Sequence, residues 1–256
     1  MIEIIPIPAF KDNYIWLLVN ITNNHCIVVD PGDASPIIRL IAQQQLLLDA
    51  ILITHHHHDH CGGIKQLTEL YPVPVYGPAH ESIDGVDHPL NENDEIYFVN
   101  FAIKFIVINI PGHTKGHIAF YSTGMLFCGD TLFSAGCGRL FEGTAEQMFK
   151  SLSKISSLPV DTQLYCAHEY TADNLRFAQT IEPDNIHIQK SIEITHTLRA
   201  QNRPTLPSVL HKELMINPFL RCHQDSVINS VKLHNGEPIS DPIKIFQALR
   251  SWKDIF

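Results

Sequence analysis

Short apolar, β-branched runs alternate with polar turns along the first two thirds of the chain. Runs of this length and composition predict strands. The predicted strands cover residues 2–7, 14–20, 26–30, 50–54, 73–76, 103–110, 118–121, 125–128 and 163–167. Apolar residues at helical spacing predict helices over 34–44, 64–71 and 145–155. Thr144, with Gln147 three residues later, has the form of a capping box and places the start of the last of these helices.

The pattern changes after residue 168. Apolar residues recur at helical spacing over 171–181, and the segments 185–203 and 242–250 have the same character, whereas strand patterns become rare. We therefore predict two domains, a strand-rich α/β domain over residues 1–170 and a mostly helical domain over residues 171–256. The sequence has no internal repeat and no low-complexity linker, so we expect the two parts to pack closely.

Composition and charge narrow the class of protein. The chain has 256 residues, of which 45% are hydrophobic and 18% charged, as in ordinary globular proteins. Its formal charge of −9 disfavours nonspecific binding to nucleic acid, whose phosphates favour a positive partner. No apolar run has the length of a membrane span, and the N-terminus lacks a basic region with a cleavage site. We expect a cytoplasmic protein with no membrane partner, in which the six scattered cysteines are reduced thiols.

The run T-H-H-H-H-D-H at residues 54–60 carries the strongest chemical signal. It follows a predicted buried strand and precedes a glycine pair and a helix, so four potential ligands lie on one turn. His55 and His57 occupy alternate positions and can point the same way from an extended chain end, whereas Asp59 and His60 can curl back toward a second point. Imidazoles with a carboxylate suit Zn, Mn or Fe. The alternative is a solvated surface histidine tract. We expect His56 and His58, at the intervening positions, to point away from any metal.

Three further candidate ligands follow predicted strands, where active-site residues often collect. These are His113, Asp130 and His168. The count favours two metals: His55, His57 and His113 can hold one, Asp59, His60 and His168 can hold the other, and Asp130 can bridge them. This leaves room for a shared water, as an open catalytic site requires. A thiolate ligand from Cys61 or Cys137 is a weaker alternative.

The histidine–aspartate run, together with the three downstream ligands, resembles the metallo-β-lactamase superfamily. That resemblance implies an α/β (α+β) fold, a four-layer αββα sandwich, here with a mostly helical C-terminal domain. A narrower resemblance is to the glyoxalase II (hydroxyacylglutathione hydrolase) family. It rests on DNY at 12–14, GRLFEGT at 138–144, CAHEYT at 166–171 and LRSWKD at 249–254, and it covers essentially the whole chain.

This resemblance implies a thioester hydrolase. Members of the family cleave S-lactoylglutathione to D-lactate and glutathione, the second step of methylglyoxal detoxification. Two divalent ions, Zn first with Fe or Mn as alternatives, would lower the pKa of a bridging water to about 7, and the resulting hydroxide would attack the thioester carbonyl. Asp59 and Asp130 are the expected catalytic side chains. No serine or cysteine nucleophile is required. We expect a monomer whose only partner is a small glutathione thioester.

By the same resemblance, five residues bind the glutathione part of the substrate: Arg139, Phe141, Tyr170, Arg250 and Lys253. Arg250 and Lys253 are three residues apart and would share one helix face, where they could hold one carboxylate together. Without the resemblance, both would be solvated charges at a fraying helix end. Two positions depart from a common family pattern: Arg139 stands where Lys is frequent, and Phe141 replaces a Tyr and so lacks a hydroxyl.

Other functions remain open at this stage. A lactonase, a β-lactamase, another thioesterase or a nuclease would share the superfamily motif, although the acidic balance disfavours the nuclease. A persulfide dioxygenase would share the fold but should lack a complete second set of ligands. From a different class, a metal-storing or metal-delivering protein would also use many of the 16 histidines.

Overall fold

The computed structural model describes residues 1–236 and 238–256. The chain forms two compact units, one made of residues 1–109 and 115–129, the other of residues 110–114 and 130–256. The division by compactness differs from the boundary near residue 170 that the change in sequence pattern suggested, and that domain boundary stays a prediction. No described helix combines the length and apolar character that a membrane span requires.

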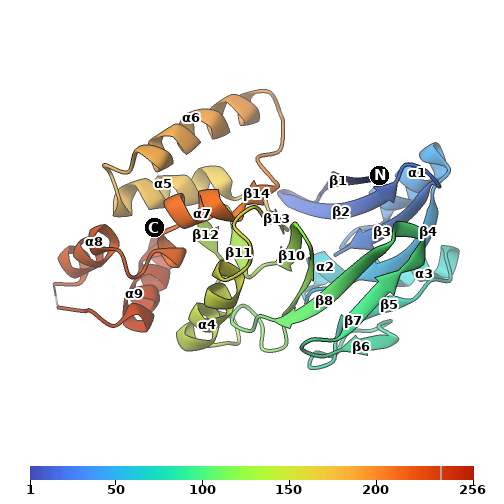
Figure 1. Ribbon diagram of the computed structural model, residues 1–256, viewed down its shortest axis with the longest axis horizontal. Coiled ribbons are helices and arrows are strands. Elements are labelled where there is room, and N and C mark those ends of the chain that lie inside the picture. The colour runs from blue at the N-terminus through green and yellow to red at the C-terminus, as the bar shows by residue number, and fades with distance from the viewer. Residues whose placement is uncertain (237) are drawn as a thin grey trace. The chain divides into compact units, whose positions relative to one another are not determined.

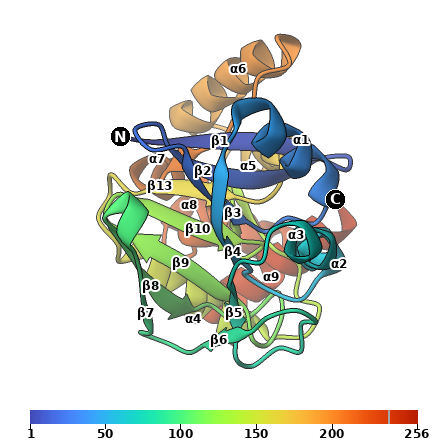
Figure 2. The same ribbon diagram turned by 90° about the vertical axis from the view of Figure 1, so that its right-hand side faces the viewer.

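The first unit contains a six-stranded sheet in the order β1-β2-β3-β4-β5-β6. Its first three strands pair antiparallel, and β3 to β6 pair parallel. The strands are β1 Ile2–Ala9, β2 Asn13–Asn20, β3 His25–Val29, β4 Leu47–Leu52, β5 Val75–Pro78 and β6 His88–Leu90. The helices of this unit are α1 Ala34–Gln44, α2 His58–Cys61 and α3 Ile64–Leu70. Helices α1 and α3 cover one face of the sheet (Figure 2).

Four more strands of the first unit pair antiparallel in the order β10-β9-β8-β7. They are β7 Glu95–Phe98, β8 Ile103–Asn109, β9 Ile118–Ser122 and β10 Met125–Gly129, with the 3₁₀ turn η1 Val99–Phe101 between the first two. These strands lie against the other face of the β1–β6 sheet (Figure 1). The rings of Tyr76 and Phe98 meet edge to face at 5.9 Å between the two sheets. The unit is therefore a helix–sheet–sheet stack.

Strand β2 is buried along nearly its whole length because both faces of its sheet are covered. Ile15 and Leu17 belong to the cluster beneath α1 and α3, whereas their neighbours Trp16 and Leu18 are also buried. A strand buried on both faces has a continuous apolar sequence instead of an alternating one. The last three residues of β4, in the same sheet, are buried as well, and the histidine run follows the end of this strand.

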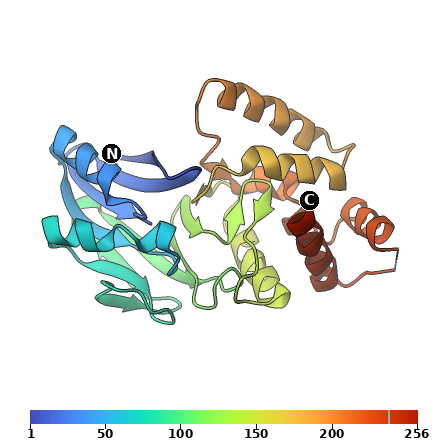
Figure 3. The same cartoon turned by 180° about the vertical axis from the view of Figure 1, so that it is seen from behind.

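The second unit is mostly helical. Its elements are the hairpin β11 Leu132–Phe133 and β12 Gly136–Cys137, α4 Ala145–Ser156, β13 Gln163–Cys166, α5 Thr171–Ile181, α6 Ile186–Ala200, β14 Ser208–Val209, α7 Leu210–Ile216, η2 Pro218–Leu220, α8 Asp225–Asn235 and α9 Pro242–Ile255. Helices α5 and α6 lie side by side (Figure 3). Helix α9 packs on α4 and α8. The rings of Phe177, Phe219 and Phe246 form an aromatic core among these helices.

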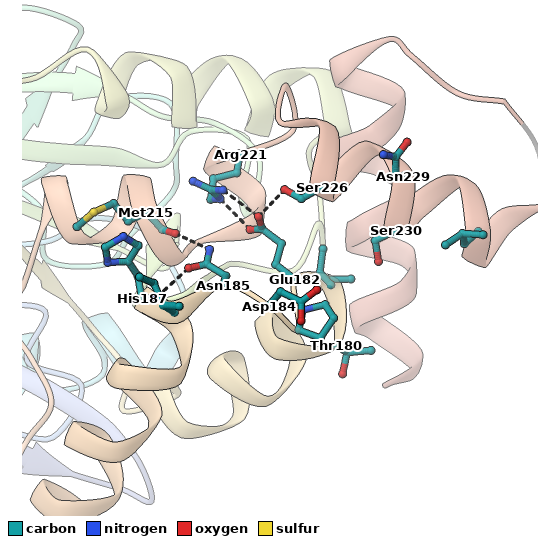
Figure 4. A pocket seen from close by; sticks show the side chains of 14 residues that line it. Thr180, Glu182, Asp184, Asn185, His187, Met215, Arg221, Ser226, Asn229 and Ser230 are labelled. Carbon is teal, nitrogen blue, oxygen red and sulfur yellow. Dashed lines mark hydrogen bonds and ion pairs between the residues drawn. The ribbon is translucent and has the colours of Figure 1, made fainter.

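The buried carboxylate of Glu182, in the second unit, is held by hydrogen bonds. The carboxylate of Glu182 accepts from Nε and Nη2 of Arg221, each at 2.8 Å, and from Oγ of Ser226 at 2.6 Å. Figure 4 shows this network beside a cavity of roughly 760 Å³. Burial raises the pKa of Glu182, but the hydrogen bonds from Arg221 and Ser226 outweigh it and hold that pKa below its usual value. The network ties the end of α5 to the start of α8.

Most of the predicted elements are confirmed. Helix α1 has the predicted bounds, and the capping box of Thr144 and Gln147 is present at the start of α4. Helix α9 continues to Ile255, five residues beyond the predicted end, because its last turn packs on Phe177 through Trp252. Helices α2, α7 and α8 and the short strands β6, β7, β11, β12 and β14 were not predicted.

Candidate metal centre and substrate pocket

The histidine run of the first unit begins just after β4 ends at Leu52. His55 and His57 lie together, with Nε2 of His55 3.1 Å from Nδ1 of His57. The ring of His55 is held at its other nitrogen, where Nδ1 lies 3.1 Å from the hydroxyl of Thr54. The ring of His117, on the same unit, stacks on His55 with centroids 4.5 Å apart. The alternation along the extended segment therefore brings two imidazoles to one point, as the sequence predicted.

Asp59 and His60 stand on α2, a single helical turn that the sequence pattern did not predict. A helical turn therefore brings these two side chains together, where the sequence predicted only that they would curl back. Oδ2 of Asp59 accepts a hydrogen bond from Nδ2 of Asn13 at 2.9 Å and lies 3.6 Å from Nε2 of His60. Gly32 has to be glycine, because a Cβ there would lie 1.9 Å from the carbonyl oxygen of Asp59.

Asp30 was missed by the sequence analysis. Its Oδ2 lies 3.0 Å from Nδ1 of buried His60, and its two oxygens also accept from the backbone and hydroxyl of Thr54 at 2.8 and 2.7 Å. When Nδ1 of an imidazole donates to a carboxylate, Nε2 keeps its lone pair for an ion. The ligand atoms of Asp30, His55 and His60 all lie within 4.8 Å of one another. An aspartate as the last residue of a predicted strand was the available signal, close to the one that singled out Asp130.

The intervening histidines face elsewhere. His56 turns toward Glu81, whose Oε2 lies 2.9 Å from Nδ1 of the imidazole. His58 is exposed. Both placements agree with the expectation that these side chains point away from a metal.

In the second unit, Asp130 lies between two imidazoles. Its Oδ2 is 3.5 Å from Nε2 of His113, and its Oδ1 is 3.3 Å from Nε2 of His168. All three residues are buried. Nδ1 of His113 lies 2.9 Å from the carbonyl oxygen of Arg139, and the ring of His168 stacks on Tyr170 at 4.7 Å. Each oxygen of Asp130 therefore faces a different imidazole nitrogen, an arrangement that suits a carboxylate shared by two ions.

The donor set fits divalent metal ions. Each unit offers imidazole nitrogens and carboxylate oxygens, which Zn, Fe and Mn all accept. Several rings are fixed through their other nitrogen, the arrangement usual for metal-binding histidines. The groups of neighbouring potential ligands found among the described residues contain histidine and aspartate but no cysteine. Burial raises the pKa of Cys137 to about 11 and also raises that of Cys61, so both hold their protons at neutral pH.

A pocket of roughly 540 Å³ lies within the second unit. Its lining includes His113 and Asp130 and also all five predicted substrate-binding residues, Arg139, Phe141, Tyr170, Arg250 and Lys253. Asp173, Arg176 and Asp254 add further charge to its wall. Residues that are more than a hundred positions apart in the sequence therefore meet in one cavity.

The predicted binding residues differ in how they are held. The side chain of Arg139 is 64% exposed, with Nε 3.6 Å from Oδ1 of Asp254. Phe141 is exposed and lies edge-on to His113 at 5.2 Å. Nζ of Lys253 donates to the carbonyl oxygen of Asp173 at 3.1 Å. Arg139 is thus the most exposed of the three cationic side chains, Arg139, Arg250 and Lys253.

Arg250 is buried, which the sequence did not predict. Only 5% of the residue is exposed. Its Nη1 donates to the carbonyl oxygen of Cys137 at 2.8 Å, and its Nη2 donates to Oδ1 of Asp254 at 3.0 Å. The guanidinium also lies 5.2 Å from the centre of the Phe219 ring. Arg250 therefore has structural partners of its own in addition to facing the pocket.

Two family models match this chain, and together they cover most of its length. The family model of the metallo-beta-lactamase superfamily matches residues 10–168, and that of the hydroxyacylglutathione hydrolase C-terminus matches residues 169–256. The hydroxyacylglutathione hydrolase of Nitrosomonas eutropha is 51% identical over 256 residues, covering 100% of both chains. The enzyme of the same name from Photobacterium profundum is 52% identical over 257 residues, again covering 100% of both chains.

Among solved structures, ETHE1 from Myxococcus xanthus matches with a TM-score of 0.66 at 20% identity and covers 99% of each chain. The BLEG-1 B3 metallo-beta-lactamase matches with a TM-score of 0.63 at 24% identity, covering 86% of this chain and 99% of its own. These two likenesses show the fold, which is the metallo-β-lactamase fold followed by a helical C-terminal segment. The full-length relatives and the two family models together place the chain in the hydroxyacylglutathione hydrolase family.

Proposed function

We propose that the protein hydrolyses the thioester S-lactoylglutathione to D-lactate and glutathione, the second step of methylglyoxal detoxification. The observation that carries this proposal is the pocket of the second unit, where His113 and Asp130 share one cavity with Arg139, Tyr170 and Lys253. A glutathione thioester has two carboxylates and one reacting carbonyl. To bind such a substrate, a site needs cations for the carboxylates and, in the same cavity, the groups that act on the carbonyl. The cations Arg139 and Lys253 line this pocket together with the potential metal ligands His113 and Asp130. The relatives named hydroxyacylglutathione hydrolase support the same substrate.

We propose further that two divalent ions are bound, one by His55, His57 and His113, the other by Asp59, His60 and His168, with Asp130 shared. Zn is the first choice, and Fe and Mn suit the same donors. TTHA1623, whose structure was solved in a di-iron-bound form, is 27% identical to this chain and covers 65% of it. When bound, such ions would lower the pKa of a water molecule to about 7, which supplies hydroxide at neutral pH, and would stabilise negative charge on a carbonyl oxygen.

The chain's own residues then orient the reaction. Asp59, held by the hydrogen bond from Asn13, can accept a hydrogen bond from the attacking water and so orient a lone pair of that water toward the carbonyl carbon. Asp30 keeps the Nε2 lone pair of His60 available. Arg139 and Lys253 line the pocket and would hold substrate carboxylates. Cys137 stays protonated and hydrogen-bonded near Arg250, so it does not act as a nucleophile.

The proposed function is tested by a thioester-cleavage assay with S-lactoylglutathione, before and after treatment with a chelator. We expect cleavage to stop in the stripped protein and to return when Zn, Fe or Mn is added back. Lactone and β-lactam substrates run in parallel should turn over far more slowly. Full cleavage by a metal-free protein would contradict the mechanism, and metal binding without any hydrolysis would indicate a store. The monomeric state and the cytoplasmic location stay predictions.

The pKa of Lys253 predicts how substrate binding changes with pH. Burial, followed by the neighbouring Arg250, lowers that pKa to about 8, while Asp173 opposes the shift. Because a lysine is charged below its pKa, the ammonium is present at pH 7 and lost as the pH rises through about 8. We expect kcat/KM to fall above about pH 8 through a rise in KM. The measurement is a pH profile of kcat and KM with S-lactoylglutathione.

The matched control for this profile is Lys253→Arg, since a guanidinium stays charged at every pH used. In that variant the fall above about pH 8 should disappear, even if KM is higher throughout. An identical fall in the variant and the parent protein would show that another group titrates.

A further inference from the structure

Glu81 stands out among the buried side chains of the first unit. It follows β5 by three residues and belongs to none of the motifs in the sequence, yet its side chain is only 3% exposed. A buried carboxylate is costly unless it is fully hydrogen-bonded. The groups that bond it therefore identify what it holds in place.

The two oxygens of Glu81 contact two different segments of the first unit. Oε2 accepts from the backbone N–H of His56 at 2.6 Å and lies 2.9 Å from Nδ1 of the same residue. Oε1 accepts from the backbone N–H of Gly116 at 3.1 Å. The approach to Gly116 is close, because a Cβ on that residue would lie 2.5 Å from Cγ of Glu81. One carboxylate thus accepts hydrogen bonds from two separate backbone segments and links them.

Each fastened residue is next to an imidazole of the histidine cluster. His56 lies between His55 and His57, and Gly116 precedes His117, whose ring stacks on His55 at an angle of 19°. Because His117 is fully buried, a shift of its backbone would displace the ring against which His55 rests. The position of His55 therefore depends on both segments that Glu81 joins.

We propose that Glu81 is a positioning residue for the metal centre: it fixes, through the backbone of His56 and Gly116, the place of His55 and His57. Glu81 belongs to none of the groups of potential metal ligands among the described residues and does not line the pocket of the second unit. The inference rests on the proposed binding of a metal by these two histidines. Outer partners of metal ligands commonly change metal affinity by about 10- to 100-fold when they are removed, because the ligands must then be ordered as the ion binds.

The test is Glu81→Gln, which keeps the size of the side chain but turns an N–H donor toward one of the backbone N–H groups. We expect the affinity for Zn, measured by competition with a chelator, to fall by about 10- to 100-fold. In the metal-free protein, hydrogen exchange at the amides of His56 and Gly116 should become faster. The exchange measurement needs neither metal nor activity.

Two control variants make the result specific. Glu69→Gln changes an exposed carboxylate on α3 and should leave both measurements unchanged. His56→Ala removes the imidazole contact but keeps the backbone hydrogen bond, so it should lower the affinity much less than E81Q does. An equal loss in His56→Ala, or an unchanged affinity in E81Q, would overturn the proposal.

If the parent protein binds no metal, the proposed function fails, while the exchange rates at His56 and Gly116 still report whether Glu81 anchors them. Should E81Q not fold, Glu81→Asp takes its place, because the side chain keeps its charge but is too short to reach both segments. The same loss of Zn affinity is expected, and normal affinity in E81D would count against the role.

Discussion

Replacing Asp130 with Ala should lower kcat for S-lactoylglutathione by at least about 10³-fold. Removing an outer partner of a metal ligand already lowers metal affinity or activity by about 10- to 100-fold, so removing a ligand proposed to serve two ions should lower activity further. The geometry singles out this residue, because its two oxygens face the Nε2 atoms of His113 and His168. The measurement is kcat at saturating substrate together with the metal content per chain, which we expect to fall below two equivalents.

Asp161→Ala is the matched control, since Asp161 is an exposed carboxylate of the same unit outside the pocket. It should keep both the metal content and the rate. Asp130→Asn separates geometry from charge, because the amide keeps the shape but has only one acceptor oxygen. Near-normal turnover by Asp130→Ala with two metals still bound would show that this carboxylate does not bridge them.

The first-unit strands and their ends could be predicted because the pattern that marks them is local. A buried strand such as β4 needs a continuous apolar run, and the polar residues that follow it can serve only a turn or a site. The same reasoning found His113, Asp130 and His168 after three other strands. The chemistry of the candidate site was thus available from residue type and position, before any distance was known.

The parts that were missed depend on contacts between distant segments. Helix α2 is one turn long and has no periodicity to detect. Asp30 and Glu81 acquire their roles only through the residues they bond, 30 positions away for His60 and 35 for Gly116. Burial of Arg250 follows from the packing of α9 against Phe219, which no local pattern encodes.

Arg139 and Arg250 should respond differently to the same substitution, although both line the pocket. Arg139→Ala should raise KM by roughly 10-fold, the loss of one charged contact, and leave the free energy of unfolding unchanged because that side chain is largely exposed. Arg250→Ala should raise KM by roughly 10- to 100-fold and also lower the free energy of unfolding by about 2–3 kcal/mol. The free energy of unfolding falls because the carbonyl of Cys137 and the ring of Phe219 lose their buried partner.

The measurements are steady-state kinetics and denaturant unfolding on the same samples of both variants. Arg250→Lys sharpens the comparison, since an ammonium keeps the charge but cannot donate in two directions to Cys137 and Asp254 as the guanidinium does. If Arg250 binds substrate directly, KM should be lower in Arg250→Lys than in Arg250→Ala, whereas the free energy of unfolding should be equally low in both variants. If its effect on KM comes only from holding β12 in place, KM and stability should change together in every variant, and the predicted direct contact with glutathione would be wrong.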